Sequence, residues 1–194
     1  GGTPINERDN LGSTPLHMAV RWDADKSIKR LLALGIDINA QNSAGKSGLA
    51  EAALTGKLET AKLLLDNGAD VNSSDTTGCT ILMDSIKGQN KDVIRLLLSY
   101  NANVAIQEIN GRNAYHEAAY TFDVNIIDMI RRAGGNPLSR DKAGNTPFSI
   151  VMKQNSKIIK AVLGTSTQIT DSDGNTPIHL VVKAKGSSTL LKEL

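Results

Sequence analysis

Two short motifs in this chain contain residue types that could do chemistry. Gly45-Lys46-Ser47 resembles the end of a phosphate-binding loop, but that motif needs another glycine five residues earlier, where this chain has Ala40. His116-Glu117 begins like the helix of a zinc protease, but Tyr120 stands where the second histidine would be. The sequence therefore predicts neither a phosphate site nor a metal site at these motifs.

The histidines and the cysteine also give little support to catalysis. His17, His116 and His179 occupy equivalent positions of a long repeat, so a linear stack would keep them far apart. We expect each to act as a hydrogen-bonding residue that ties adjacent turns together. Cys79 is the only cysteine, and after a turn glycine it is expected to be an inert surface thiol. We therefore expect that the chain is not an enzyme and that it has no catalytic residues, no metal and no cofactor.

A unit of 33 residues recurs along the chain. Its marker is the quartet Thr14-Pro15-Leu16-His17, which returns in altered form at 47–50, 80–83, 113–116, 146–149 and 176–179. The first four steps are 33 residues long and the last is 30. A fixed period in this range indicates a stack of small units, each too thin to bury its own apolar face. Such a stack favours a surface that contacts another molecule over an enclosed catalytic pocket.

Each unit reads as a tight turn followed by two helices. An acidic or amide residue opens the turn and a glycine ends it, as in Asp75-Thr76-Thr77-Gly78. The quartet then starts a short helix, with Thr suited to the N-cap and Pro to the first helical position. The second helix shows apolar residues at i, i+3 and i+4, as at Ile94, Leu97 and Leu98. In the fourth unit, Phe122 replaces the helix-breaking glycine that the second unit has at Gly56.

Thr-Pro-Leu-His at 14–17, Gly-Ala-Asp-Val-Asn at 68–72 and the 33-residue step together resemble the ankyrin repeat. The resemblance runs from about Gly2 to the C-terminus. It implies an all-α fold, an ankyrin-repeat solenoid of about six helix-turn-helix units with short β-hairpin fingers. The expected parts of this one array are a preceding repeat's tail at 1–8, repeats 1 to 4 at 9–41, 42–74, 75–107 and 108–140, a short repeat 5 at 141–170 and an incomplete repeat 6 at 171–194.

Composition limits the classes of partner. Aromatic residues make up only 3% of the chain, so the core must be aliphatic. A net charge of +2 argues against a nucleic acid partner. No apolar run reaches the length of a membrane span, so no membrane insertion is expected. A cytoplasmic location is expected from the lone cysteine and from a start, Gly1-Gly2-Thr3-Pro4, that is no signal peptide.

By resemblance, partners dock on the concave face made of the finger tips and the first helix of each pair. Carried over position by position, this surface is rich in basic residues. The candidate partner-binding residues are Arg21, Trp22, Lys46, Lys87, Arg112, Tyr120, Lys142, Lys153 and Lys183. Two interpretations stay open: a groove for an acidic protein segment, or a mixed-charge face on which Glu51, Asp84 and Glu117 neutralise neighbouring cations such as Lys87.

The sequence therefore favours a non-enzymatic protein-protein interaction module that binds a partner protein and no small-molecule substrate. The alternative is the targeting arm of a larger enzyme or of a host-directed effector. Sequence immediately outside these 194 residues would separate the two, because a catalytic domain there would support the second.

Overall fold

The computed structural model describes residues 5–152, 154, 156–164, 169–171 and 173–183. Within these residues, eleven α-helices alternate with loops. The chain divides into two compact units, Gly1–Asn103 and Val104–Leu194.

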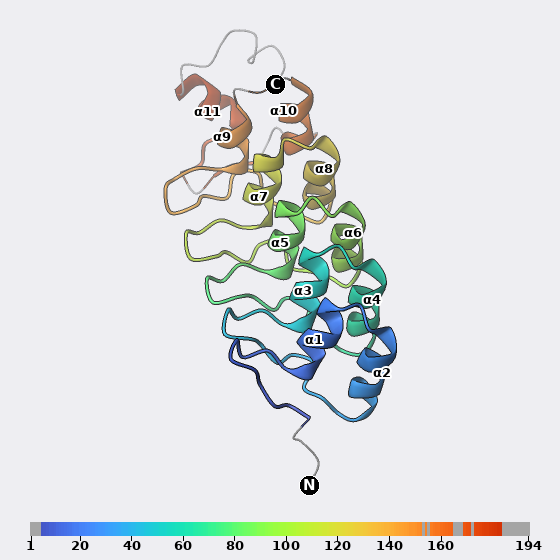
Figure 1. The fold of residues 1–194 in the computed structure, drawn as a ribbon. Coiled ribbons are helices and arrows are strands. Elements are labelled where there is room, and N and C mark those ends of the chain that lie inside the picture. The colour runs from blue at the N-terminus through green and yellow to red at the C-terminus, as the bar shows by residue number, and fades with distance from the viewer. Residues whose placement is uncertain (1–4, 153, 155, 165–168, 172, 184–194) are drawn as a thin grey trace. The chain divides into compact units, whose positions relative to one another are not determined.

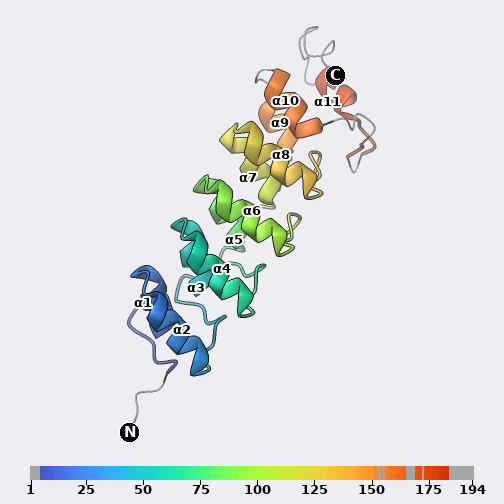
Figure 2. The ribbon, with the colours of Figure 1, turned by 90° about the vertical axis from the view of Figure 1, so that its right-hand side faces the viewer.

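The first unit consists of three helix pairs and the loops between them. The pairs are α1 (Pro15–Arg21) with α2 (Asp25–Ala33), α3 (Gly48–Leu54) with α4 (Leu58–Asp66), and α5 (Ile81–Lys87) with α6 (Lys91–Ser99). The inner helices α1, α3 and α5 follow one another beside the projecting loops, and the outer helices α2, α4 and α6 lie behind them (Figures 1 and 2). α1 packs on α3, α3 on α5, and α4 on α6, so each pair shares its apolar side with the next.

The second unit repeats this arrangement with α7 (Ala114–Thr121), α8 (Val124–Arg132), α9 (Pro147–Val151), α10 (Ser156–Leu163) and α11 (Pro177–Lys183). α7 packs on α8 and α9, and α10 packs on α8 and α9. Two aromatic residues, Tyr115 and Phe148, are fully buried here. The Tyr115 hydroxyl donates a hydrogen bond to the Val162 carbonyl, which satisfies the one polar group of that ring.

The turn inside each helix pair keeps one backbone conformation whatever side chain it carries. In each of the four pairs whose turn the structure describes throughout, the residue at this turn has a positive φ: 56° at Asp23, 72° at Gly56, 54° at Gln89 and 53° at Phe122. Only glycine adopts this left-handed region at no cost. The fold therefore keeps the turn in the fourth expected repeat even though Phe122 has replaced the glycine.

The fingers are tight turns stabilised by side-chain hydrogen bonds, and they have little of the strand pairing of a β-hairpin. Isolated antiparallel bridges join Gln41 to Ser47 and Ser74 to Thr80, and the described residues contain no longer strand. Some neighbouring fingers are also joined by a backbone hydrogen bond: the Ser43 amide donates to the Leu11 carbonyl at 2.9 Å and the Lys142 amide to the Asn110 carbonyl at 2.8 Å. The short β-hairpins expected from the family resemblance are thus reduced to single bridges.

Two of the three histidines tie adjacent fingers together, as the sequence predicts. His17 is fully buried; its Nδ1 accepts from the Thr14 amide and its Nε2 donates to the Lys46 carbonyl at 2.9 Å. His116 repeats the contact, with Nε2 at 3.2 Å from the Asn145 carbonyl. His179 is exposed and contacts Thr176 of its own turn.

Candidate partner-binding surface

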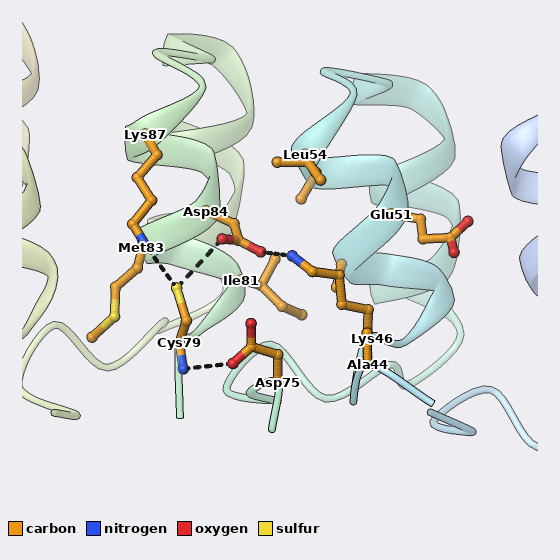
Figure 3. Close-up of polar contacts among 12 residues, drawn as sticks. Ala44, Lys46, Glu51, Leu54, Asp75, Cys79, Ile81, Met83, Asp84 and Lys87 are labelled. Atoms are coloured by element: carbon orange, nitrogen blue, oxygen red, sulfur yellow. Dashed lines mark hydrogen bonds and ion pairs between the residues drawn. The ribbon is translucent and has the colours of Figure 1, made fainter. Parts of the chain in front are cut away.

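Five polar residues of the first unit form a compact group, the Cys79 cluster, on the inner side of α5. It consists of Lys46, Asp75, Cys79, Asp84 and Lys87. Lys46 comes from the finger before α3, Asp75 and Cys79 come from the finger before α5, and Asp84 and Lys87 belong to α5 itself. The two lysine side chains approach the cluster from opposite sides (Figure 3).

The carboxylate of Asp84 is the centre of the Cys79 cluster. Asp84 is only 7% exposed. Oδ2 forms an ion pair with the Lys46 ammonium, and Oδ1 accepts a hydrogen bond from the Cys79 thiol at 3.3 Å. The Lys87 ammonium in turn lies 3.0 Å from the Cys79 sulfur. A buried carboxylate needs such partners, because an unpaired buried charge is strongly unfavourable.

The expectation that Cys79 is a surface thiol is wrong. Cys79 is 5% exposed, because the finger folds it under α5. Burial is the largest influence on its pKa, which is raised from 9.0 to about 11. At neutral pH the group is therefore a thiol that donates to Asp84, and it lacks the thiolate character of a nucleophile.

Ligand atoms of Asp75, Cys79 and Asp84 lie within 4.8 Å of one another, the spacing of a metal site. The donor set fits a cation poorly, however. Lys46 already supplies a positive charge to Asp84, and the raised pKa keeps the thiol protonated. Asp75 Oδ1 accepts the backbone amides of Thr77 and Cys79 at 2.8 and 3.0 Å. Hydrogen-bond donors and a cation of the protein itself already satisfy the carboxylates of this cluster, and we assign no metal to it.

The same pairing recurs along the inner helices. In the first unit, the Arg21 guanidinium lies 2.8 Å from Glu51 of the next inner helix, as Lys46 reaches Asp84 of the one after. In the second unit, Arg112 Nε lies 3.4 Å from Glu108 and 3.7 Å from Glu117. Predicted partner-binding cations thus share their charge with carboxylates of the chain itself, which is the mixed-charge arrangement left open by the sequence.

The remaining candidate residues are placed differently. Trp22 is 70% exposed and stands at the end of α1, beside a hollow on the first helix pair. Tyr120 of α7 is 45% exposed. Lys142 is exposed on its finger, and Lys183 is exposed with its ammonium 2.7 Å from Asn175. Lys153 lies outside the described residues.

Exposed apolar residues near these positions were missing from the sequence prediction. Leu54 closes α3 and Phe122 follows α7, and their exposed fractions are 43% and 41%. Ile109 at a finger tip is 62% exposed. A sequence signal exists, because Leu54 is in the first helix of its pair and Ile109 is at a finger tip, the two parts that the family resemblance places on the concave face.

Comparisons with known proteins agree with this fold. Residues 49–141 match a family model described as three copies of ankyrin repeats, and residues 11–43 match a model of one ankyrin repeat. Together the two matches cover well over half of the chain. The chain belongs to the ankyrin repeat family, whose members are generally non-catalytic protein-protein interaction modules. A search of curated proteins found no match.

None of the helices that the structure describes has the length and apolar character needed to cross a membrane.

Proposed function

We propose that this chain binds a partner protein through the fingers and inner helices of its two units. The observation that carries the proposal is a set of large apolar side chains left in solvent beside satisfied ion pairs, Leu54 in the first unit and Tyr120 with Phe122 in the second. Aromatic and aliphatic side chains of this kind commonly act as interface anchors. A preformed surface loses little conformational entropy on binding, so a few anchors can suffice.

The proposal assigns charge a secondary role. Arg21 and Lys46 already have carboxylate partners, so an acidic partner segment must compete with Glu51 and Asp84 for them. Lys142 is better placed, because it is exposed and forms no ion pair within the described part of the chain. We therefore propose that apolar anchors supply most of the affinity and that acidic residues of the partner add contacts at Lys142.

Affinity capture followed by mass spectrometry tests this function. We would compare the unaltered chain with the anchor variant Leu54→Ala/Tyr120→Ala and with the control Leu34→Ala. Leu34 is 55% exposed and ends the outer helix α2, so it offers a similar loss of apolar area away from the proposed surface.

The expected result is that the anchor variant loses the captured protein while the control retains it, with helical circular dichroism unchanged in both. Equal recovery by the unaltered chain and the anchor variant would remove the assignment of this surface. Trp22 is left out of the anchor variant because it stands beside a different feature, the hollow on the first helix pair.

A further inference from the structure

A hollow of about 830 Å³ opens on the side of α1 and α2 that faces away from α3. Its apolar walls include Pro15, Met18, Ala19, Trp22 and Leu31. Every lining residue belongs to the first unit. Three long cations, Arg8, Lys26 and Arg30, also border it.

The hollow corresponds to a surface that is covered in the later helix pairs. In α2, Ser27 is exposed and Leu31 is half-buried. One repeat later, the equivalent Thr60 and Leu64 are 2% and 0% exposed. One repeat later again, the equivalent positions, Val93 and Leu97, are 1% and 0% exposed. The burial differs because a helix pair precedes α3 and α4, and another precedes α5 and α6.

Contacts between the first two pairs show what such a cover does. Thr60 donates to Asp23 at 3.1 Å, and the Lys57 ammonium binds the carbonyls of Val20 and Arg21 at the end of α1. A Cβ on Gly48 of α3 would stand 3.5 Å from Leu16. Pro15 is the equivalent of Gly48, and it lines the hollow with no helix against it among the described residues.

The residues that enter the first finger are already in the register of a repeat tail. Asn6 Oδ1 accepts the Asp37 amide at 3.0 Å, just as Asn39 accepts the Asp70 amide at 2.8 Å one repeat later. Asn39 follows α2, the outer helix of its own repeat. Asn6 therefore has the contacts of a residue that follows an outer helix.

Ser13, on the wall of the hollow, lacks a donor that the equivalent carbonyls have wherever the preceding repeat carries the quartet histidine, as at Lys46 and Asn145. Its carbonyl accepts only the Asp9 amide among the described residues, whereas the equivalent carbonyl of Lys46 accepts both the Asn42 amide and His17 Nε2. Its side chain is 2% exposed and its Oγ has no hydrogen-bond partner. Buried polar atoms are rarely left in this state.

We propose that the hollow binds the helix pair of a further ankyrin repeat, placed before residue 5 in the same polypeptide. Its inner helix packs an aliphatic residue against Pro15 and Ala19, and its quartet histidine donates to the Ser13 carbonyl. Its outer helix presents a carboxylate to Arg30, which occupies the position that Leu63 has in the next pair. Covering the hollow also covers the indole of Trp22.

Trp22 is the only tryptophan, so its fluorescence reports on the hollow directly. The test replaces residues 1–8 with a second copy of residues 9–41, in which the copied tryptophan is changed to phenylalanine. We expect the emission of Trp22 to shift to the blue, its quenching by acrylamide to fall several-fold and the Tm to rise. The matched control carries the same copy with Leu16→Asp and Val20→Asp in the copied inner helix only, and its Trp22 should stay as accessible as in the unaltered chain.

A second variant checks the geometry. Ala24 stands where the next pair has Lys57, so Ala24→Lys should raise the Tm in the extended chain, which offers helix-end carbonyls, and leave it unchanged in the unaltered chain. An extended chain with the added helical dichroism but a fully accessible Trp22 would overturn the proposal. So would Trp22 burial that grows with the concentration of the unaltered chain, because a second copy would then occupy the hollow.

Discussion

Lys46 and Asp84 illustrate how single residues hold two consecutive repeats together. The Asp84 carboxylate is buried, and its neutralising charge comes from a lysine in the preceding repeat. Lys46→Met removes that charge, while Asp84 keeps its hydrogen bond from the Cys79 thiol. We expect the free energy of unfolding to fall by about 1–3 kcal/mol. This loss is smaller than for a fully buried ion pair, because Lys46 is partly exposed to solvent. Urea denaturation followed by circular dichroism measures it.

The ion pair between Arg95 and Asp92 provides the matched control, since both side chains are more than half exposed. Arg95→Met should change the free energy of unfolding by less than about 1 kcal/mol. The double variant Lys46→Met/Asp84→Leu should be less destabilised than Lys46→Met, because no unpaired charge remains. Equal losses for Lys46→Met and Arg95→Met would contradict the role given to burial.

The Cys79 thiol predicts a distinct pH dependence. Its pKa is raised by burial from 9.0 to about 11 in the folded chain, so between these values the folded state holds a proton that the unfolded state has lost. Stability from this group is complete below pH 9 and declines as the pH rises toward 11. The Tm of the unaltered chain should therefore fall faster than that of Cys79→Ala above pH 9. Parallel Tm curves for the two proteins would show that the thiol ionises equally in both states.

At the scale of elements, the turn between α7 and α8 stores backbone strain. Phe122 has φ 53°, where a residue with a Cβ is about 1–2 kcal/mol less stable than in the right-handed region. The side chain is 41% exposed, so its removal forfeits little packing. Phe122→Gly should raise the free energy of unfolding of the second unit by up to about 1 kcal/mol, after the entropy cost of glycine.

Phe122→Ala is the control for this turn, since alanine also carries a Cβ and keeps the strain. Denaturant titration of both variants should place the glycine variant above the alanine variant. A glycine variant that is no more stable than the alanine variant would mean that lost contacts of the ring outweigh the relieved strain.

Elements were predictable from this sequence because their signals are local. The quartets and the i, i+3, i+4 apolar spacing place both helices of each pair, and the histidine tie follows from family resemblance. The other contacts between repeats carry no such signal. The i, i+3 spacing of Asp84 and Lys87 gives no indication of the ion pair that Asp84 forms with Lys46, which comes from another repeat. Burial of Cys79 likewise depends on how its finger folds under α5, which no residue spacing indicates.

At the scale of the whole molecule, charge is nearly balanced, with 22 basic and 20 acidic residues. This balance is partly internal, because cations of the candidate surface are paired with carboxylates of neighbouring helices. A chain of this kind has little net field with which to attract an acidic partner over long distances. We therefore expect apolar anchors, more than charge, to select the partner.

The dependence of binding on salt separates the anchors from the charges. At 0.1 M salt, interactions between exposed charges more than about 10 Å apart are largely screened. Apolar contacts are almost unaffected by salt at these concentrations. For the partner recovered by capture, we expect the Kd to change by less than about tenfold between roughly 0.05 and 0.5 M NaCl. Lys142→Ala should reduce that small change further, whereas Leu54→Ala should weaken binding equally at both concentrations. A Kd that rises steeply with salt, and that Leu54→Ala leaves unaltered, would assign partner selection to the basic residues instead.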